Sequence, residues 1–194
     1  MTRRQFLGVA GGCLTAASGL GPTSAQPLAA TTAPSRSGTQ TPAPARYACV
    51  GCFTSASRKA RGEGLAVFRV GESGRLDPLQ IIPSIPPAWT SNNTASGIVV
   101  SPSGRFVYAS NRGHDSVGAF AIDAATGVLS PVGWEASGGT VPRFIGLDPS
   151  GTRLYAANQG SDTIVEFKVD EASGRLARTG LTIATGTPVC VVFW

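Results

Sequence analysis

A short polar stretch gathers several side chains that could do acid–base chemistry. Arg112, His114 and Asp115 lie together between two apolar runs, and His114 is the single histidine of the chain. An imidazole with its ordinary pKa of about 6.5 can act as a general base near neutral pH. A guanidinium such as that of Arg112 can hold a carboxylate or phosphate through two hydrogen bonds. The stretch indicates an anion-binding site with a base, although its Asn, Gly and Asp residues are also typical of tight turns.

Other charged residues could join this site if the fold brought them near it. Arg143 opens a later apolar run, and Arg58, Arg61 and Glu63 precede the apolar run that begins at Leu65. Arg143 would be a second group able to hold an anion. Whether these residues meet His114 depends on the order and direction of the elements that carry them.

An internal repeat defines those elements. The segment SPSGRFVYASN at 101–111 returns as DPSGTRLYAAN at 148–158, an offset of 47 residues. Three further pairs follow the same offset: Asp115 with Asp162, Phe120 with Phe167, and Gly127 with Gly174. The two aspartates are typical turn residues, whereas Phe120 and Phe167, together with the similar Phe68, are expected in the core.

Each unit of the repeat predicts four short strands. In the last unit they are Arg143–Leu147, Arg153–Ala157, Thr163–Val169 and Arg175–Ile183, which alternate apolar and polar residues between Gly-, Asp- and Ser-containing turns. Repeated four-stranded units of this length are typical of β-propeller blades. In such a meander, the loops between strands two and three share a face with the links between units. Arg112, His114, Arg143, Arg61 and Glu63 are therefore expected on one face, near the axis of the ring.

The two ends of the repeat region are incomplete units. Tyr47–Cys52 looks like a second strand without a first, and Pro188–Val192 looks like a first strand without a second. We expect the C-terminal strand to complete the N-terminal unit. The fold class is then an all-β propeller with about three blades, although propellers typically need about 4 to 8 to close a ring.

The N-terminal region predicts export. Residues 1–25 combine the pair Arg3-Arg4, an apolar stretch and small residues before Ala25, as in a signal peptide of the twin-arginine type. Residues 26–45 are rich in Pro, Ser, Thr and Ala and read as a flexible linker before the folded part at 46–194. The expected location is the bacterial periplasm or the exterior, with no membrane association after cleavage.

Composition narrows the classes of function. Hydrophobic residues make up 42% of the chain and charged residues 14%, which favours a globular core over disorder. The formal charge of +5 includes Arg3 and Arg4 and is too scattered to predict nucleic-acid binding. Cys49 and Cys52 have C-x-x-C spacing, but a zinc site lacks further ligands, so buried strand cysteines are favoured over a metal or redox site. We expect neither a metal nor a cofactor.

Several motifs resemble a known family. The stretch 110–116 followed by Phe120, and the segments 60–65, 141–144 and 156–159, are similar to the lactonase family of seven-bladed propellers. This family includes propeller-type 6-phosphogluconolactonases and carboxymuconate-cyclising enzymes. The resemblance implies a lactone-hydrolysing enzyme acting on a small-molecule lactone. It implies His114, Arg112 and Arg143 as catalytic residues, and Arg61, Glu63, Asn111 and Asn158 as substrate-binding residues.

Two departures from the family leave alternatives open. The middle blades are missing, and Gly97-Ile98 stands where the family often has Glu-Ile, whose glutamate is a candidate catalytic residue. The chain could instead be a degenerate lactonase, a fragment of a full-length one, or a non-catalytic exported propeller that binds a protein or glycan. Self-association could cover the open edges of its blades.

Overall fold

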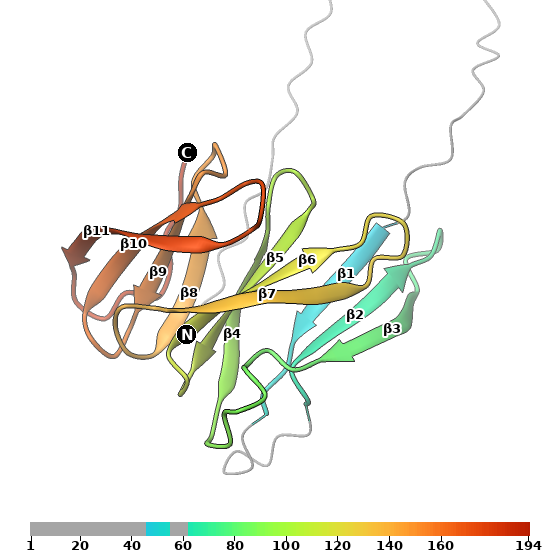
Figure 1. Ribbon diagram of the computed structural model, residues 1–194, viewed down its shortest axis with the longest axis horizontal. Helices are drawn as coiled ribbons and strands as arrows, with labels where there is room; N and C mark the ends of the chain where they lie inside the picture. Colours follow the sequence, from blue (N-terminus) through green and yellow to red (C-terminus); the bar gives the residue numbers. More distant parts are fainter. Residues whose placement is uncertain (1–45, 55–61) are drawn as a thin grey trace, which may run out of the picture. The chain divides into compact units, whose positions relative to one another are not determined.

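The protein is built of antiparallel sheets, as the repeat predicts. The computed structural model describes residues 46–54 and 62–194, and in these ranges every regular element is a β-strand. The strands form three separate sheets in chain order (Figure 1). The first contains β1 (Arg46–Gly51), β2 (Leu65–Val70) and β3 (Leu76–Ile82). The second contains β4 (Thr94–Val100), β5 (Phe106–Arg112), β6 (Ser116–Ile122) and β7 (Leu129–Ala136). The third contains β8 (Pro142–Leu147), β9 (Arg153–Asn158), β10 (Thr163–Val169) and β11 (Leu176–Ala184).

The sheets confirm the prediction of about three meandering blades. The second and third have four strands each, paired in sequence order, whereas the first has three. Equivalent residues of the repeat adopt equivalent conformations: Asp115 and Asp162 have φ angles of 51° and 54°. Phe120 and Phe167 are both fully buried. The offset in the sequence therefore relates equivalent positions of two successive sheets.

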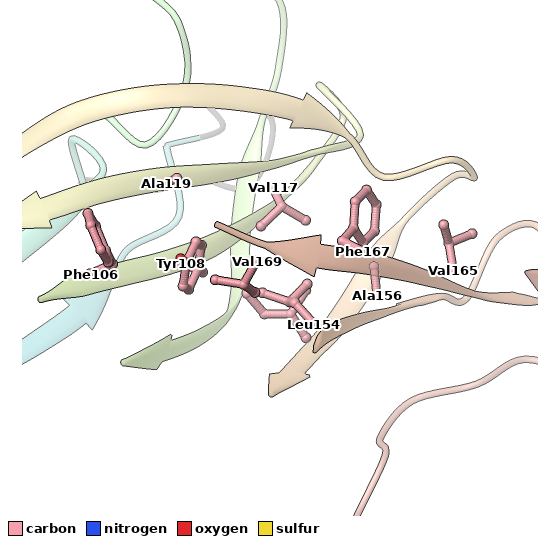
Figure 2. Close-up of a cluster of buried hydrophobic side chains, with 10 residues drawn as sticks. Phe106, Tyr108, Val117, Ala119, Leu154, Ala156, Val165, Phe167 and Val169 are labelled. Carbon is pink, nitrogen blue, oxygen red and sulfur yellow. The ribbon is translucent and has the colours of Figure 1, made fainter. Parts of the chain in front are cut away.

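Two apolar clusters cover the two faces of the middle sheet. One cluster joins it to the third sheet through residues such as Tyr108, Leu154 and Phe167 (Figure 2). The other joins it to the first sheet through residues such as Leu65, Val67 and Phe120. The middle sheet alternates which side chains it presents to each neighbour, because successive strand residues point to opposite faces.

The core prediction for Phe68 is only partly correct. Phe68 is half-buried, whereas its equivalents Phe120 and Phe167 are fully buried. Those two phenylalanines pack toward the preceding sheet in the chain. The first sheet has no predecessor among the described residues, so Phe68 lacks the neighbour that would cover it.

The predicted pairing of the two ends is wrong for this structure. Residues 185–194 form no strand, and β1 pairs with β2 alone among the described strands. The C-terminal tail instead contacts the third sheet, where the Phe193 ring lies 5.4 Å from that of Tyr155. The first and third sheets pack on opposite faces of the middle one, and the tail pairs with no strand of the described residues. Cys190, expected to be buried in that strand, is exposed.

The signal-peptide and linker predictions, residues 1–25 and 26–45, lie outside the described residues. Among those that the structure does describe, no helix is long and apolar enough to cross a membrane.

Candidate functional site

Arg112 and Arg143 line one open hollow between the sheets. The hollow has a volume of about 330 Å³, and its walls are Gly51, Phe53, Ala95, Ser96, Arg112, Arg143 and Val189. Arg112 is the last residue of β5, and Arg143 is the second residue of β8. The loop-rich face predicted from the meander thus brings these two cations together, as expected from their positions in the repeat.

Local contacts position both arginines. The Arg112 guanidinium lies over the ring of Phe53, with its central carbon 5.6 Å from the ring centroid. Phe53 is itself held by a bridge to Thr94, the residue that pairs with Arg112 in the β4–β5 register. Arg143 is exposed, and its carbonyl accepts a 2.6 Å hydrogen bond from the Ser96 hydroxyl across the gap between β4 and β8. Two guanidinium groups beside a serine hydroxyl can hold an anion such as a carboxylate or phosphate.

His114 follows Arg112 by two residues, but its side chain lies outside the walls of this hollow. The imidazole Nδ1 is 2.6 Å from the Ser116 hydroxyl, and the ring packs edge-on against Trp89 with centroids 4.8 Å apart. Burial lowers the pKa of His114, and the negative charge of Asp115 partly offsets this effect. The imidazole is therefore neutral near pH 7, which is the form that a general base requires. The predicted group of three catalytic residues is brought together only in part.

Trp89 is a neighbour that sequence reasoning missed. It lies in the irregular segment 83–93, between β3 and β4, which has no equivalent in the repeat. The sequence signal that could have indicated Trp89 as a site residue was its place in a segment that departs from the repeat.

Asn111 and Asn158, predicted to bind substrate, are fully buried at equivalent positions. Asn111 donates from Nδ2 to the Ser84 carbonyl at 2.8 Å, and Asn158 donates to the Ser137 carbonyl at 3.0 Å. Ser84 and Ser137 lie in the links that enter the second and third sheets. These amides therefore hold the links in place, and a substrate would have to displace those bonds to reach them. Their predicted contact with substrate stays a prediction.

The remaining predicted site residues are at the loop between β1 and β2. Arg61 and Arg58 lie outside the described residues. Glu63 is exposed. The amide of the preceding residue, Gly62, donates a 3.1 Å hydrogen bond to the carbonyl of Phe53, which lines the hollow. Glu63 itself is not among the residues that line the hollow, so its predicted contact with substrate stays a prediction.

Gly97 of β4 lies close to the backbone of β8. A Cβ atom at this position would be 2.7 Å from the Ile145 backbone nitrogen, too near for any side chain to fit without a shift. The glycine therefore serves the close packing of the two sheets. A glutamate at this position would have no room in this arrangement, so the site lacks that carboxylate.

The cysteines form no disulfide within the described part of the chain. Cys49 is half-buried in β1, and burial raises the pKa of its thiol, which disfavours the reactive thiolate. Residues 46–54 and 62–194 contain no group of three or more His, Cys, Asp or Glu side chains arranged to hold a metal.

Comparison with known proteins places these features in a family context. Residues 62–193 match the sequence family described as "Lactonase, 7-bladed beta-propeller". A 6-phosphogluconolactonase of Bacillus subtilis is 38% identical over 71 residues, which are 37% of this chain and 20% of that enzyme.

Solved structures show the same relationship. The periplasmic gluconolactonase of Pseudomonas aeruginosa superimposes with a TM-score of 0.61 and 34% identity, over 64% of this chain and 34% of the other. A protein from Lactobacillus plantarum gives a TM-score of 0.62 and 30% identity, over 65% of this chain and 37% of the other. The matched region thus spans about a fifth of the length of the curated relative and about a third of each solved structure.

Proposed function

Because the chain belongs to the lactonase family of seven-bladed β-propellers, we propose that it acts on a lactone by hydrolysing the ring ester, as 6-phosphogluconolactonases do. In this reaction water adds to the lactone carbonyl, the ring C–O bond breaks, and a hydroxy acid is released. A base must take the proton of the water, and positive charge must stabilise the oxyanion that forms.

The observation that carries the proposal is the pair of arginines in one hollow. Arg112 and Arg143 come from different sheets and line the same 330 Å³ space. Such a pair suits a substrate with a carboxylate or phosphate, or the oxyanion itself. Ser96 adds a hydroxyl to the same wall.

His114 is the candidate base. Its Nδ1 faces the Ser116 hydroxyl, which leaves Nε2 as the ring nitrogen that would take the proton of the water. This role requires the substrate to extend from the hollow toward the loop that follows β5.

The predicted export of the chain bears on the choice of substrate. A phosphorylated sugar lactone is an intracellular kind of compound, so an exported enzyme would more naturally meet an unphosphorylated sugar lactone. We therefore propose gluconolactone-type substrates first, with 6-phosphogluconolactone as the comparison.

Steady-state hydrolysis of both lactones by the full chain tests this function. Arg143→Ala should raise KM about ten- to a hundredfold, since a charge-assisted contact contributes about 1.5–3 kcal/mol. His114→Ala should lower kcat while leaving KM nearly unchanged. Arg75→Ala, an exposed arginine paired with Asp77 on the first sheet, is the matched control and should change neither constant.

A non-catalytic binding protein is the second candidate, favoured by two observations. Gly97 occupies the place of the family's glutamate, and His114 lies outside the hollow. In that case calorimetry would detect lactone or aldonate binding that depends on Arg143, with no turnover. Turnover that is unaffected by Arg143→Ala would place the active site elsewhere.

A further inference from the structure

The link that enters the third sheet has a distinctive conformation. Asp115, in the preceding β5–β6 loop, accepts hydrogen bonds from the Ser137 amide at its carbonyl and from the Val141 amide at its carboxylate, each 2.9 Å long. Val141 has a φ angle of 56°, and the buried Pro142 then begins β8. We call this arrangement, an aspartate that accepts two backbone hydrogen bonds from the link and a positive φ angle just before a proline, the joint. It directs the chain into the first strand of a blade.

The same joint occurs again after the last sheet. Asp162, the equivalent of Asp115, accepts from the Thr185 amide at its carbonyl, at 2.9 Å, and from the Thr187 amide at its carboxylate, at 2.7 Å. Thr187 has a φ angle of 47°, and the buried Pro188 follows it. Residues 188–192 are thus directed as the first strand of a further blade, although they pair with no strand here.

The first sheet lacks this kind of strand. In the second and third sheets, β5 and β9 each pair with a first strand, β4 and β8. The equivalent strand of the first sheet is β1, which has a partner on one edge only among the described strands. An unpaired strand edge is a template for another strand.

The outer face of the first sheet also lacks a neighbouring sheet among the described residues. Phe68 lines an apolar hollow of about 350 Å³, where its equivalents Phe120 and Phe167 are covered by the preceding sheet. Gly127 and Gly174 lie against the rings of Tyr47 and Phe106 of the preceding sheet, whereas their equivalent Gly74 has open space. Two repeated contacts therefore indicate that a blade belongs on this face.

We propose that a second copy of this chain supplies both missing parts. Residues 188–192 of one copy add to β1 of the other as an antiparallel first strand, and the third sheet of the first copy packs on the Phe68 face of the other. In a pair of chains that exchange tails reciprocally, each first sheet becomes four-stranded and six sheets follow one another around the assembly. Six lies within the range of about 4 to 8 blades that closes a propeller ring. The assembly continues the interface that already exists twice within the chain.

The repeat fixes the register of this pairing. Phe167 pairs with Leu154, and the equivalent Phe68 pairs with Ala48, so Tyr155 is equivalent to Cys49. Tyr155 pairs with Gly146 of β8, whose equivalent in the tail, 46 residues later, is Val192. Val192 of one copy therefore lies opposite Cys49 of the other, with both side chains on one face.

A cross-linking experiment tests this register. In the full chain with Cys13, Cys52 and Cys190 changed to serine, Val192→Cys should form a disulfide between chains with the native Cys49 under mild oxidation. The product would be a covalent dimer on a non-reducing gel. The matched control is Val191→Cys, whose side chain is on the opposite face of the strand and should give no dimer. A disulfide within one chain, or equal dimer from both variants, would overturn the proposal.

Light scattering on the unmodified chain gives an independent readout. We expect twice the mass of one chain, reduced to one chain mass by Val192→Pro, because the equivalent Gly146 occupies a hydrogen-bonded pair with Tyr155 and proline at this position removes the pairing donor. Trp194→Ala, beyond the proposed strand, should leave the dimer intact. A monomer at all concentrations, or a dimer indifferent to Val192→Pro, would show that the tail does not join two copies.

Discussion

Gly174→Ala probes the contact that the repeat makes between neighbouring blades. Gly174 lies in the β10–β11 hairpin with a φ angle of 75°, and an added Cβ would collide with the ring of Phe106 in the middle sheet. Phe106 is 5% exposed and packed in the cluster between the two sheets, so its ring has little room to move. The substitution therefore strains both the backbone and the interface.

The two costs can be separated with a second glycine. Gly104 has a φ angle of 68° in the β4–β5 turn, and an added Cβ there would meet no atom within 4 Å. Gly104→Ala should cost about 1 kcal/mol in the free energy of unfolding, from the left-handed backbone alone. Gly174→Ala should cost the same plus about 1–3 kcal/mol for overpacking against Phe106.

Urea denaturation of the two variants measures the difference. A lower midpoint for Gly174→Ala with an unchanged m-value would assign the extra cost to the native interface. Equal midpoints would refute the reasoning, since they would mean that the Phe106 ring shifts freely and that the contact between the sheets is loose.

Three other predictions address the buried amide, the histidine and export. Asn158→Ala should lower the free energy of unfolding by about 1–3 kcal/mol, because it leaves the Ser137 carbonyl buried and unpaired, and a neutral result by denaturation would contradict that role. Because burial lowers the pKa of His114 below its ordinary value of about 6.5, the folded state favours neutral imidazole; stability should be complete above that pH and fall as pH decreases through it. His114→Gln should remove this pH dependence in thermal melts, and a profile unchanged by the substitution would assign it to other groups. Replacing Arg3 and Arg4 by lysine should block export in a bacterial fractionation assay, and normal export would reject the twin-arginine assignment.

The fold was predictable because the information that defines it is local and repeated. The turn residues of the repeat and the alternation along Thr163–Val169 specify strands whose observed bounds agree closely with the expected ones. The sequence also predicted that Arg112 and Arg143 would lie on the same face, because alternate turns of an antiparallel meander lie at the same end of the sheet. No knowledge of distant contacts was needed for either result.

What failed depended on contacts between segments far apart in the sequence. The His114 ring packs against Trp89, which lies in a segment without a repeat equivalent, so no pattern predicted their approach. The burial of Phe68 depends on which sheet covers the first one, and strand periodicity does not specify that neighbour. The position of the tail likewise depends on how three sheets are arranged around one another.

The joint at Asp115 and Asp162 has a consequence for how such genes can change length. Each joint is made by an aspartate of one unit and the link that leaves the same unit, and the Asp162 joint forms although no further sheet follows it among the described residues. A deletion or duplication that removes or adds whole units preserves every such joint and leaves each strand intact. A change of part of a unit would separate the aspartate from its link. The architecture therefore tolerates gain and loss in whole repeats, and chains with different numbers of blades remain accessible by single recombination events.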